Sequence, residues 1–141
     1  MIIGISGKLY SGKNTFAACL LREFDYRGIT FHLKSFGFKL KKIGAYLTNT
    51  PEDLWFTQEG KQQYLNAWGM TIGEFQQKLG TEAMRECIHK DGWVMALMAD
   101  YDPFCNWIVT DVRFLNEAES IKSRGGIIIR IEGDPLGKRH T

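Results

Sequence analysis

The sequence predicts an α/β fold with a mainly parallel central sheet. Short apolar runs rich in β-branched residues alternate with segments whose apolar residues recur at helical spacing. The first such run leads through a glycine-rich loop into a helical segment. Because strands joined through helices pair in parallel, we expect three layers, with helices on both faces of the sheet. A length of 141 residues, of which 44% are hydrophobic and 24% charged, suits one packed domain.

The expected elements follow one another in a regular order. Thr71 and Glu74 form a capping-box pattern, which places a helix start at Thr71. Gly80 either interrupts this helix or starts a turn between two helices, and residues 48–70 show no clear pattern. The expected strands are 1–6, 29–36, 106–112 and 127–133. The expected helices run from the end of the first loop to Gly28, over 38–47, from Thr71 onward, over 92–101 and over 115–124. Gly44 lowers the helix propensity of the segment 38–47.

Composition argues against several classes of protein. The net charge of +2 gives no reason to expect nucleic-acid binding, and no apolar run approaches the roughly 18 residues that a membrane span needs. Three cysteines without C-x-x-C spacing argue against a zinc site or a disulfide framework and fit a reducing cytosol. We therefore expect a cytoplasmic protein with no nucleic-acid or membrane partner. Cys19 and Cys87 fall on apolar helix faces, where we expect them to be buried.

The stretch "GISGKLYSGKNT", residues 4–15, is typical of a phosphate-binding loop. Gly7, Gly12 and Lys13 match the pattern G-x-x-x-x-G-K between a strand and a helix. Glycines let the backbone curl so that N–H groups point at an anion, and the helix start adds its unpaired donors. Lys13 would reach the β- and γ-phosphates of a nucleotide, with Ser11 as a further loop contact. The alternative is a tight glycine-rich turn that binds nothing.

The residue after Lys13 departs from the usual motif. Asn14 stands where Ser or Thr is common, and the hydroxyl comes one position later, at Thr15. We expect Thr15 to place its hydroxyl on a phosphate or near Mg²⁺, for which Asn14 is the poorer ligand. This G-K-x-T form resembles the loop of nucleoside monophosphate kinases more than that of GTPases or motor ATPases.

Asp111 and Arg113 follow the third predicted strand, in "TDVRF". The carboxyl ends of parallel strands meet at one edge of a sheet, which is also the edge of the glycine-rich loop. There Asp111 could hold a magnesium-bound water, and Arg113 could bind a phosphate through two parallel hydrogen bonds. The alternative is an aspartate that caps a turn and an arginine paired with Glu117.

Polar residues in "LGTEAMRE" and the glutamines before it suggest a second group of contacts. The amides of Gln76 and Gln77 and the hydroxyl of Thr81 could read a base edge. Arg85 could bind a phosphate, although a solvated helix face is the commoner arrangement. Trp55 and Trp68 either line a base pocket or pack in the core.

Taken together, these motifs resemble those of the deoxynucleoside monophosphate kinases of tailed bacteriophages and their prophage relatives. The resemblance runs from residue 1 to about 140 and rests on "SGKLYSGKNT", "SFGFKLKK", "TIGEFQQKLGTEAMRE" followed by "GWV", and "VTDVRFLNEAESIKSRGGIIIRI". It implies the P-loop NTPase fold of the adenylate-kinase-like superfamily in a single domain, 1–141, with a helical acceptor-binding region at about 38–90 inserted between the second and third strands.

The resemblance also implies an activity and its site. The γ-phosphoryl group of ATP would be transferred, with Mg²⁺, to a deoxynucleoside monophosphate in the cytoplasm of a bacterial host, if the protein is phage-encoded. A homodimer is reasonable, and the preferred base is open. Lys13, Asp111 and Arg113 are the expected catalytic residues, and Thr15 and Asp111 the expected metal ligands. The expected ATP contacts are Gly7, Ser11, Gly12, Lys13, Asn14, Thr15 and Arg139, and the expected substrate contacts are Lys41, Gln77, Thr81, Arg85, Trp93 and Arg113.

Three departures from that family stand out. Gly73 stands where Arg is expected, and residues 37–39 lack the usual Asp-Pro. The chain stops at "GKRHT", where relatives continue into a lid, a fifth strand and a last helix, so Arg139 and His140 would only begin the lid. Two rival functions stay open: another small-metabolite kinase, such as a dephospho-coenzyme A kinase, and a nucleotide-binding module without catalysis.

Overall fold

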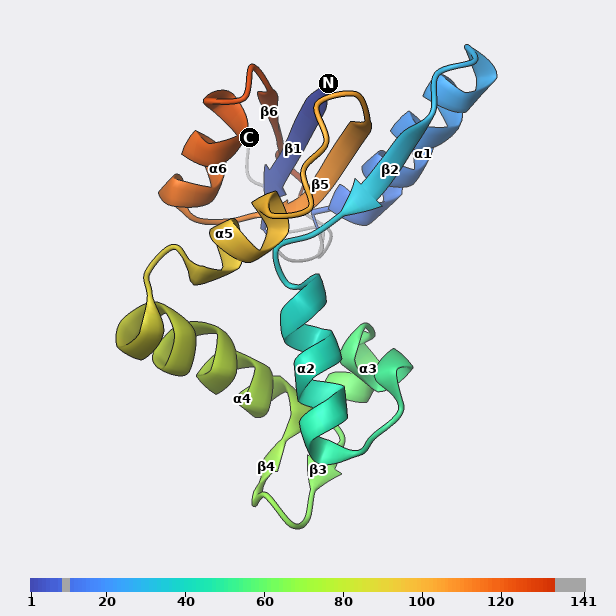
Figure 1. Ribbon diagram of the computed structural model, residues 1–141. Helices are drawn as coiled ribbons and strands as arrows, with labels where there is room; N and C mark the ends of the chain where they lie inside the picture. Colours follow the sequence, from blue (N-terminus) through green and yellow to red (C-terminus); the bar gives the residue numbers. More distant parts are fainter. Residues whose placement is uncertain (9–10, 134–141) are drawn as a thin grey trace, which may run out of the picture. The chain divides into compact units, whose positions relative to one another are not determined.

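A computed structural model describes residues 1–8 and 11–133 of the chain, which forms two compact units (Figure 1). Unit 1 is built from Met1–Ser35 and from the chain beyond Asp100, and unit 2 is Phe36–Ala99. Each unit has a hydrophobic cluster of its own. A single kinase domain with an acceptor-binding insertion at about 38–90 stays a prediction.

Unit 1 contains a four-stranded sheet in which all neighbouring strands run parallel. This confirms the predicted α/β class with a mainly parallel central sheet. The third predicted strand has the predicted bounds, whereas the second is shorter than 29–36 at both ends. In sheet order the strands are β2 (Phe31–Lys34), β5 (Asn106–Val112), β1 (Ile2–Gly7) and β6 (Ile127–Ile131).

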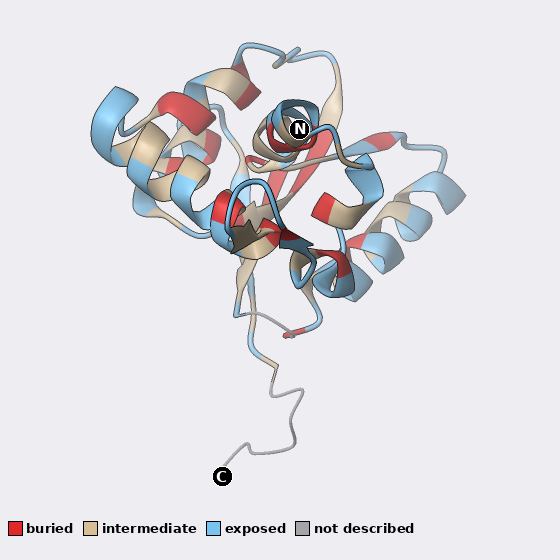
Figure 2. Cartoon of the chain, turned by 90° about the horizontal axis from the view of Figure 1, so that it is seen from below, coloured by how far each residue is buried: buried red, intermediate tan, exposed pale blue. Residues whose placement is uncertain are grey.

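Helices α1 (Lys13–Tyr26) and α6 (Leu115–Lys122) flank this sheet on opposite faces. Ile3 and Ile5 of β1 share a buried cluster with α1. Gly4 faces the other way, because a Cβ added there would lie 2.7 Å from Cδ1 of Ile121 in α6. Successive residues of a strand point to opposite faces, so the sheet lies between the two helices. Figure 2 shows buried residues along the strands and exposed residues on the outer sides of the helices.

Strand β5 carries an extra residue beside the end of β1. Gly4 pairs with Val109, and Ser6 pairs with Val112. Between these two pairs β1 advances by two residues, whereas β5 advances by three. A bulge of this kind turns the following side chains to new directions and is common beside active sites. The irregular stretch contains Asp111, the carboxylate that the sequence predicts to be functional.

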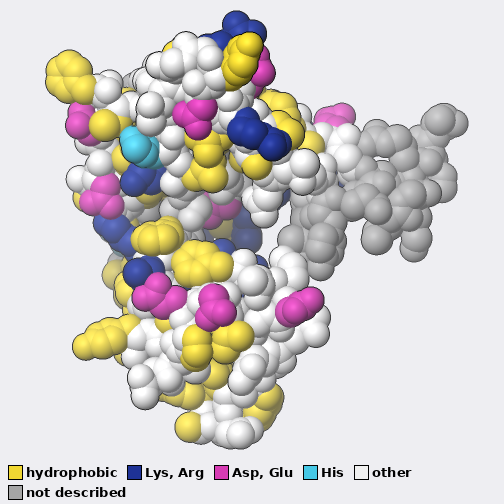
Figure 3. All heavy atoms as spheres, turned by 90° about the vertical axis from the view of Figure 1, so that its right-hand side faces the viewer, with side chains coloured by type: hydrophobic (Ala, Val, Ile, Leu, Met, Phe, Trp, Pro, Cys, Tyr) yellow, Lys and Arg dark blue, Asp and Glu magenta, His cyan; other side chains and the backbone are white. Residues whose placement is uncertain are grey.

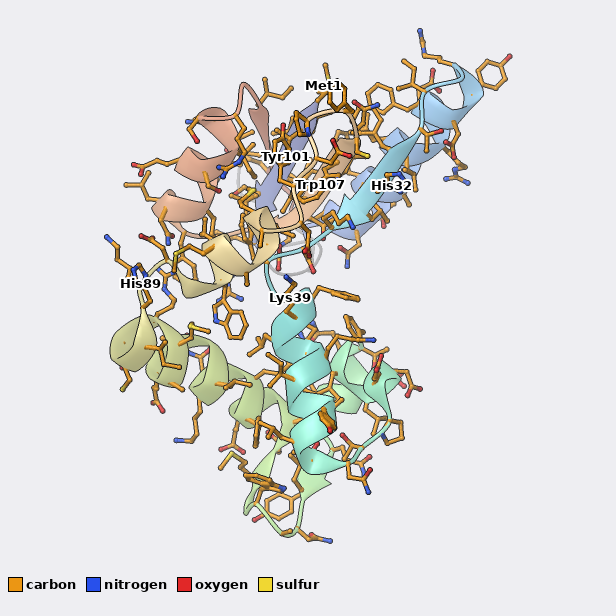
Figure 4. The ribbon with its side chains drawn as sticks, in the orientation of Figure 1. Met1, His32, Lys39, His89, Tyr101 and Trp107 are labelled. Atoms are coloured by element: carbon orange, nitrogen blue, oxygen red, sulfur yellow. The ribbon has the colours of Figure 1, made fainter. Side chains whose placement is uncertain are left out.

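Trp107 fixes the start of β5 against the N-terminus. Its side chain is buried, and Tyr101 packs edge-on against it with ring centroids 5.3 Å apart (Figure 4). The Trp107 N–H donates to the carbonyl oxygen of Met1, and the N-terminal ammonium donates to Oδ1 of Asn106 at 2.8 Å. These contacts hold the beginning of β1 beside β5.

Unit 2 is mainly helical, and residues 48–70, which show no pattern in the sequence, form several short elements. Among them is a two-stranded antiparallel hairpin that periodicity does not reveal. In chain order the elements are α2 (Phe38–Thr48), the 3₁₀-helix η1 (Glu52–Trp55), α3 (Gln58–Lys61), β3 (Tyr64–Leu65), β4 (Met70–Thr71), α4 (Ile72–Gln77), the π-helix η2 (Lys78–Ile88) and α5 (Gly92–Met98).

Trp55 forms the centre of the unit 2 core. It is fully buried, packs edge-on against Phe75, and donates its indole N–H to Oγ1 of Thr50 at 2.8 Å. Trp68 also packs against Phe75 but is 45% exposed. Of the two arrangements open for Trp55, core packing is therefore the one observed.

The helix that starts at Thr71 continues past Gly80. The capping box is confirmed: Glu74 N–H donates to Oγ1 of Thr71 and Thr71 N–H donates to Oε1 of Glu74, both at 3.1 Å. The α-helix gives way to the wider π-helix η2 at Lys78, and the chain stays helical to Ile88. Of the two alternatives for Gly80, the turn between two helices is therefore wrong, and the regular α-helix is interrupted just before this residue, at Lys78.

The surface contradicts one further expectation. Cys19 and Cys87 are exposed, so the prediction of buried thiols is wrong. In α1, Ala17 and its partly buried apolar neighbours face the sheet, and Cys19 lies outside that stripe. On the face drawn in Figure 3, acidic, basic and apolar side chains are intermixed. Over the described residues, no helix combines the length and the apolar character needed to cross a membrane.

Candidate active site

The loop between β1 and α1 turns at two glycines with different roles. Gly12, directly before α1, has φ 94°, a left-handed backbone conformation that residues other than glycine rarely adopt. Gly7 is required for close approach, because a Cβ there would lie 2.7 Å from both Oγ of Ser11 and the carbonyl oxygen of Ile131. Ser11 N–H closes the loop on the carbonyl oxygen of Lys8 at 3.0 Å.

The start of α1 presents hydrogen-bond donors without acceptors. Over the described ranges, no acceptor is found for the N–H groups of Lys13, Asn14 and Thr15, as expected for a first helical turn. Ser11 is only 8% exposed, and its buried Oγ has no hydrogen-bond partner among the described residues. A buried hydroxyl without a partner is costly, and the positive end of the helix dipole favours an anion. These groups together suit a phosphate.

Two charged residues of the β5 end lie within electrostatic reach of Lys13. Burial lowers the pKa of Lys13, while the charge of Asp111 raises that pKa and the charge of Arg113 lowers it. The guanidinium of Arg113 lies over the ring of Phe114, with its central carbon 5.4 Å from the ring centroid. Unit 1 thus brings Lys13, Asp111 and Arg113 together at the carboxyl edge of its sheet.

Glu117 is a residue of this edge whose contribution the sequence reasoning missed. Only 6% exposed, it accepts hydrogen bonds at Oε1 from the N–H groups of Arg113 at 2.8 Å and Phe114 at 2.9 Å. Burial raises the pKa of Glu117, and these two N–H groups oppose that shift. Its contact with Arg113 runs through the backbone, unlike the side-chain pair considered from the sequence. One signal in the sequence could have indicated the contact with the N–H group of Phe114: Glu117 comes three residues after Phe114, the residue directly before α6, which is the spacing of a capping box.

In unit 2, the predicted residues Gln77, Thr81 and Arg85 occur at intervals of four along α4 and η2. Gln77 Nε2 donates to Oγ1 of Thr81 at 3.2 Å, and Arg85 is half-buried. Gln76 points elsewhere, because its Nε2 donates to the carbonyl oxygen of Trp55 at 2.8 Å. The amide–hydroxyl pair and the arginine therefore share one helix, whereas Gln76 supports the core.

Trp93 and Lys41 are the other predicted substrate residues in unit 2. Trp93 is buried, and its Nε1 donates to the carbonyl oxygen of Gly80 at 3.1 Å, which ties α5 to η2. Lys41 Nζ lies 5.1 Å from the ring centroid of Phe56. On the same helix Lys39, labelled in Figure 4, donates to the carbonyl oxygen of Ala96 at 2.6 Å. The predicted ATP residue Arg139 lies outside the described residues.

The donor set in unit 1 fits a magnesium ion that binds together with phosphates. Mg²⁺ commonly takes one or two carboxylates plus phosphate oxygens and keeps several waters. Asp111 offers a carboxylate near Lys13, and Thr15 offers an exposed hydroxyl in the first turn of α1. Over residues 1–8 and 11–133, no three or more His, Cys, Asp or Glu side chains are grouped so that they could hold a metal.

Comparison with known proteins connects this arrangement to a family. The chain is 32% identical, over 157 aligned positions, to a protein of Acanthamoeba polyphaga mimivirus that is provisionally named a deoxynucleotide monophosphate kinase. The alignment covers 100% of this chain and 78% of the viral protein. The chain belongs to this deoxynucleotide monophosphate kinase family. No family model matches it.

Two points follow from membership of the deoxynucleotide monophosphate kinase family. The alignment includes the whole chain, so both unit 1 and the helical unit 2 belong to the shared sequence. The relative is encoded by a virus of an amoeba, so the expected bacteriophage type of the kinase stays a prediction.

Proposed function

We propose that this protein is a deoxynucleoside monophosphate kinase, which transfers the γ-phosphoryl group of ATP to a deoxynucleoside 5′-monophosphate and releases ADP. The observation that carries the proposal is a set of donors at the start of α1, including the buried Ser11 hydroxyl, that have no acceptor among the described residues and lie next to Lys13, Asp111 and Arg113. The name of the mimivirus relative supports the choice of a deoxynucleotide as acceptor.

The donor phosphates of ATP would occupy the β1–α1 loop. The N–H groups of Lys13, Asn14 and Thr15 and the hydroxyl of Ser11 would donate to phosphate oxygens. Burial makes the Lys13 charge unfavourable in the free protein, as its lowered pKa indicates, and a bound polyphosphate would reverse this. Lys13 is therefore suited to a ligand that brings negative charge with it.

Asp111 and Thr15 would hold Mg²⁺ beside these phosphates. A magnesium ion bound there supplies neutralisation of the charge on the β- and γ-phosphate oxygens. In the free protein, the carboxylate of Asp111 favours the charged form of Lys13, since it raises the pKa of that lysine against the effect of burial. The same carboxylate would thus stabilise the charge of Lys13 in the free protein and hold Mg²⁺ when the phosphates of ATP are bound.

Phosphoryl transfer at this site needs no strong general base, because the acceptor phosphate is already ionised. An oxygen of that phosphate forms a bond to the γ-phosphorus, and the bond from the γ-phosphorus to the bridging oxygen of ADP breaks. Arg113 would hold the acceptor phosphate through two parallel hydrogen bonds. Catalysis then consists mainly of positioning and charge neutralisation, as is usual for this reaction.

The acceptor nucleoside would be bound by residues of unit 2. Gln77 and Thr81 would read the base edge, and Arg85 and Lys41 would add positive charge for its phosphate. Trp93, whose N–H is already bonded to Gly80, would contribute its ring. These assignments rest on the motif resemblance and on the line of polar residues along α4 and η2.

A coupled ADP-release assay tests the proposal with each of the four deoxynucleoside monophosphates. We expect ADP release that requires a deoxynucleoside monophosphate and is lost in Lys13→Met, while the circular dichroism spectrum stays unchanged. ADP release with dephospho-coenzyme A instead would favour the other small-metabolite kinase. Binding of ATP and a deoxynucleotide without ADP formation would favour a binding module.

A further inference from the structure

We propose that Glu117 is a positioning residue for phosphoryl transfer, which acts by holding the backbone at the end of β5. It touches neither substrate nor phosphate in this proposal, and it acts through Arg113 and Phe114. The inference rests on the proposed function, because it explains how one part of that site keeps its geometry.

The contacts of Glu117 single it out among the acidic residues of α6. One oxygen, Oε1, accepts both the Arg113 N–H and the Phe114 N–H, at 2.8 and 2.9 Å. These two N–H groups lie between the end of β5 and the start of α6. Glu117 is 6% exposed, whereas Glu119 on the same helix is exposed. Glu117 thus supplies an acceptor for both N–H groups of the turn.

The turn that Glu117 holds also orients Arg113. The guanidinium lies over the Phe114 ring, so both ends of this contact belong to residues whose backbone N–H groups are bonded to the same oxygen. Loss of that oxygen would release the backbone of Arg113 and the ring beneath its guanidinium together. A displacement of about 1 Å at a positioning group is enough to cost about 100-fold in rate.

Burial gives a second reason to assign a role to this carboxylate. Placing an ionised carboxyl in a buried position opposes folding, and the N–H bonds offset part of that cost. An exposed glutamate one turn away would satisfy neither backbone group. The neighbouring charges of Asp111 and Arg113 act on Glu117 in opposite directions, so no net attraction to them accounts for its place.

Two substitutions distinguish the effect of the length of the Glu117 side chain from the effect of its charge. Glu117→Gln keeps an acceptor oxygen at the same distance and removes the charge, whereas Glu117→Asp keeps the charge and shortens the side chain by one carbon. We expect kcat within about threefold of wild type for Glu117→Gln, and a loss of about 10- to 100-fold for Glu117→Asp. In Glu117→Asp, KM for the deoxynucleoside monophosphate should rise and KM for ATP should stay within about twofold. Glu119→Gln is the matched control and should leave both constants unchanged.

Amide hydrogen exchange of Arg113 and Phe114 provides a measurement that does not depend on turnover. We expect both amides to exchange at least about tenfold faster in Glu117→Asp and to stay protected in Glu117→Gln. A folded Glu117→Asp with wild-type kcat, or a Glu117→Gln as impaired as Glu117→Asp, would overturn the inference. A wild-type protein that is folded but makes no dNDP would instead refute the proposed function, and the exchange rates would still show whether Glu117 holds the turn.

Discussion

Gly44 and Trp55 are packed against each other so closely that the indole ring occupies the space where a side chain at position 44 would lie. A Cβ built on Gly44 would collide with the six-membered part of that ring, including Cζ3 and Cη2. Gly44 is in the middle of α2, where glycine lowers helix propensity. The loss in propensity is therefore offset by the burial of Trp55 at the centre of unit 2.

Gly44→Ala should destabilise the protein by about 1–3 kcal/mol, because overpacking must displace a fully buried tryptophan. Gly80→Ala is the matched control, since a Cβ there would meet Leu40 Cδ2 at an ordinary 3.5 Å. Alanine at position 80 should change the free energy of unfolding by less than about 1 kcal/mol. Urea denaturation of both variants decides the matter, and equal destabilisation would contradict the assigned role of Gly44.

Lys13→Met should lower turnover by at least about 100-fold while leaving the melting temperature unchanged or higher. The reason is that burial disfavours the Lys13 charge in the free protein, as its lowered pKa indicates, and the charge becomes favourable with phosphate bound. The coupled ADP-release assay measures turnover and thermal melts give the melting temperature, while calorimetric titration with Mg–ATP measures the affinity for ATP. Lys8→Met, an exposed lysine of the same loop, should leave the affinity for ATP nearly unchanged. A marked drop in the melting temperature of Lys13→Met would argue for a structural role.

Glu117 should make wild-type stability depend on pH in a definite direction. Its folded pKa is raised above 4.5, chiefly by burial, so between 4.5 and that raised value the native state binds more protons than the unfolded state. Stability from this group therefore increases as the pH falls through that window and decreases as the pH rises. Relative to Glu117→Gln, which does not titrate, the wild type should become more stable as the pH is lowered from about 7 toward 4.5. Parallel urea titrations measure the difference, and the opposite trend would contradict the raised pKa.

Gly133→Ala should weaken ATP binding. The backbone at Gly133 runs against the carbonyl group of Ser11, and a Cβ there would collide with its oxygen. Since that obstacle is backbone, the loop before α1 must move, and we expect a destabilisation of about 1–3 kcal/mol together with a loss of affinity of about tenfold. Glu132→Ala, which removes an exposed side chain of the same segment, is the control. Unchanged ATP affinity in Gly133→Ala would show that this contact does not shape the loop.

Elements with strong local patterns were predictable from the sequence. The seven residues of β5 form an apolar, β-branched run, and their bounds were predicted correctly. The capping box of Thr71 and Glu74 was visible because all its parts lie within four residues. By contrast, β3 and β4 have two residues each, too few to show a period.

Features that depend on partners distant in the sequence could not be predicted. The role of Gly44 depends on Trp55, and local propensity gave only a weakened helix. The bulge before Val112 depends on the register with β1, which the sequence of β5 does not specify. The convergence of Lys13, Asp111 and Arg113 was predictable, because the edge of a parallel sheet is defined by topology. The spacing between Phe114 and Glu117 was a local signal for one backbone contact. The burial of Glu117 and its second contact, with the N–H group of Arg113, were not predictable, since no pattern marks a polar residue of α6 as buried.

The position of β1 in its sheet has a consequence for synthesis of the chain. Ile2 pairs with Trp107 and Ile3 with Ile127, so both neighbours of β1 are translated more than 100 residues after it. The whole of unit 2, with its own core, is synthesised before either partner strand. During that interval the isoleucine-rich β1 has two open edges, which makes the nascent chain a natural client for chaperones.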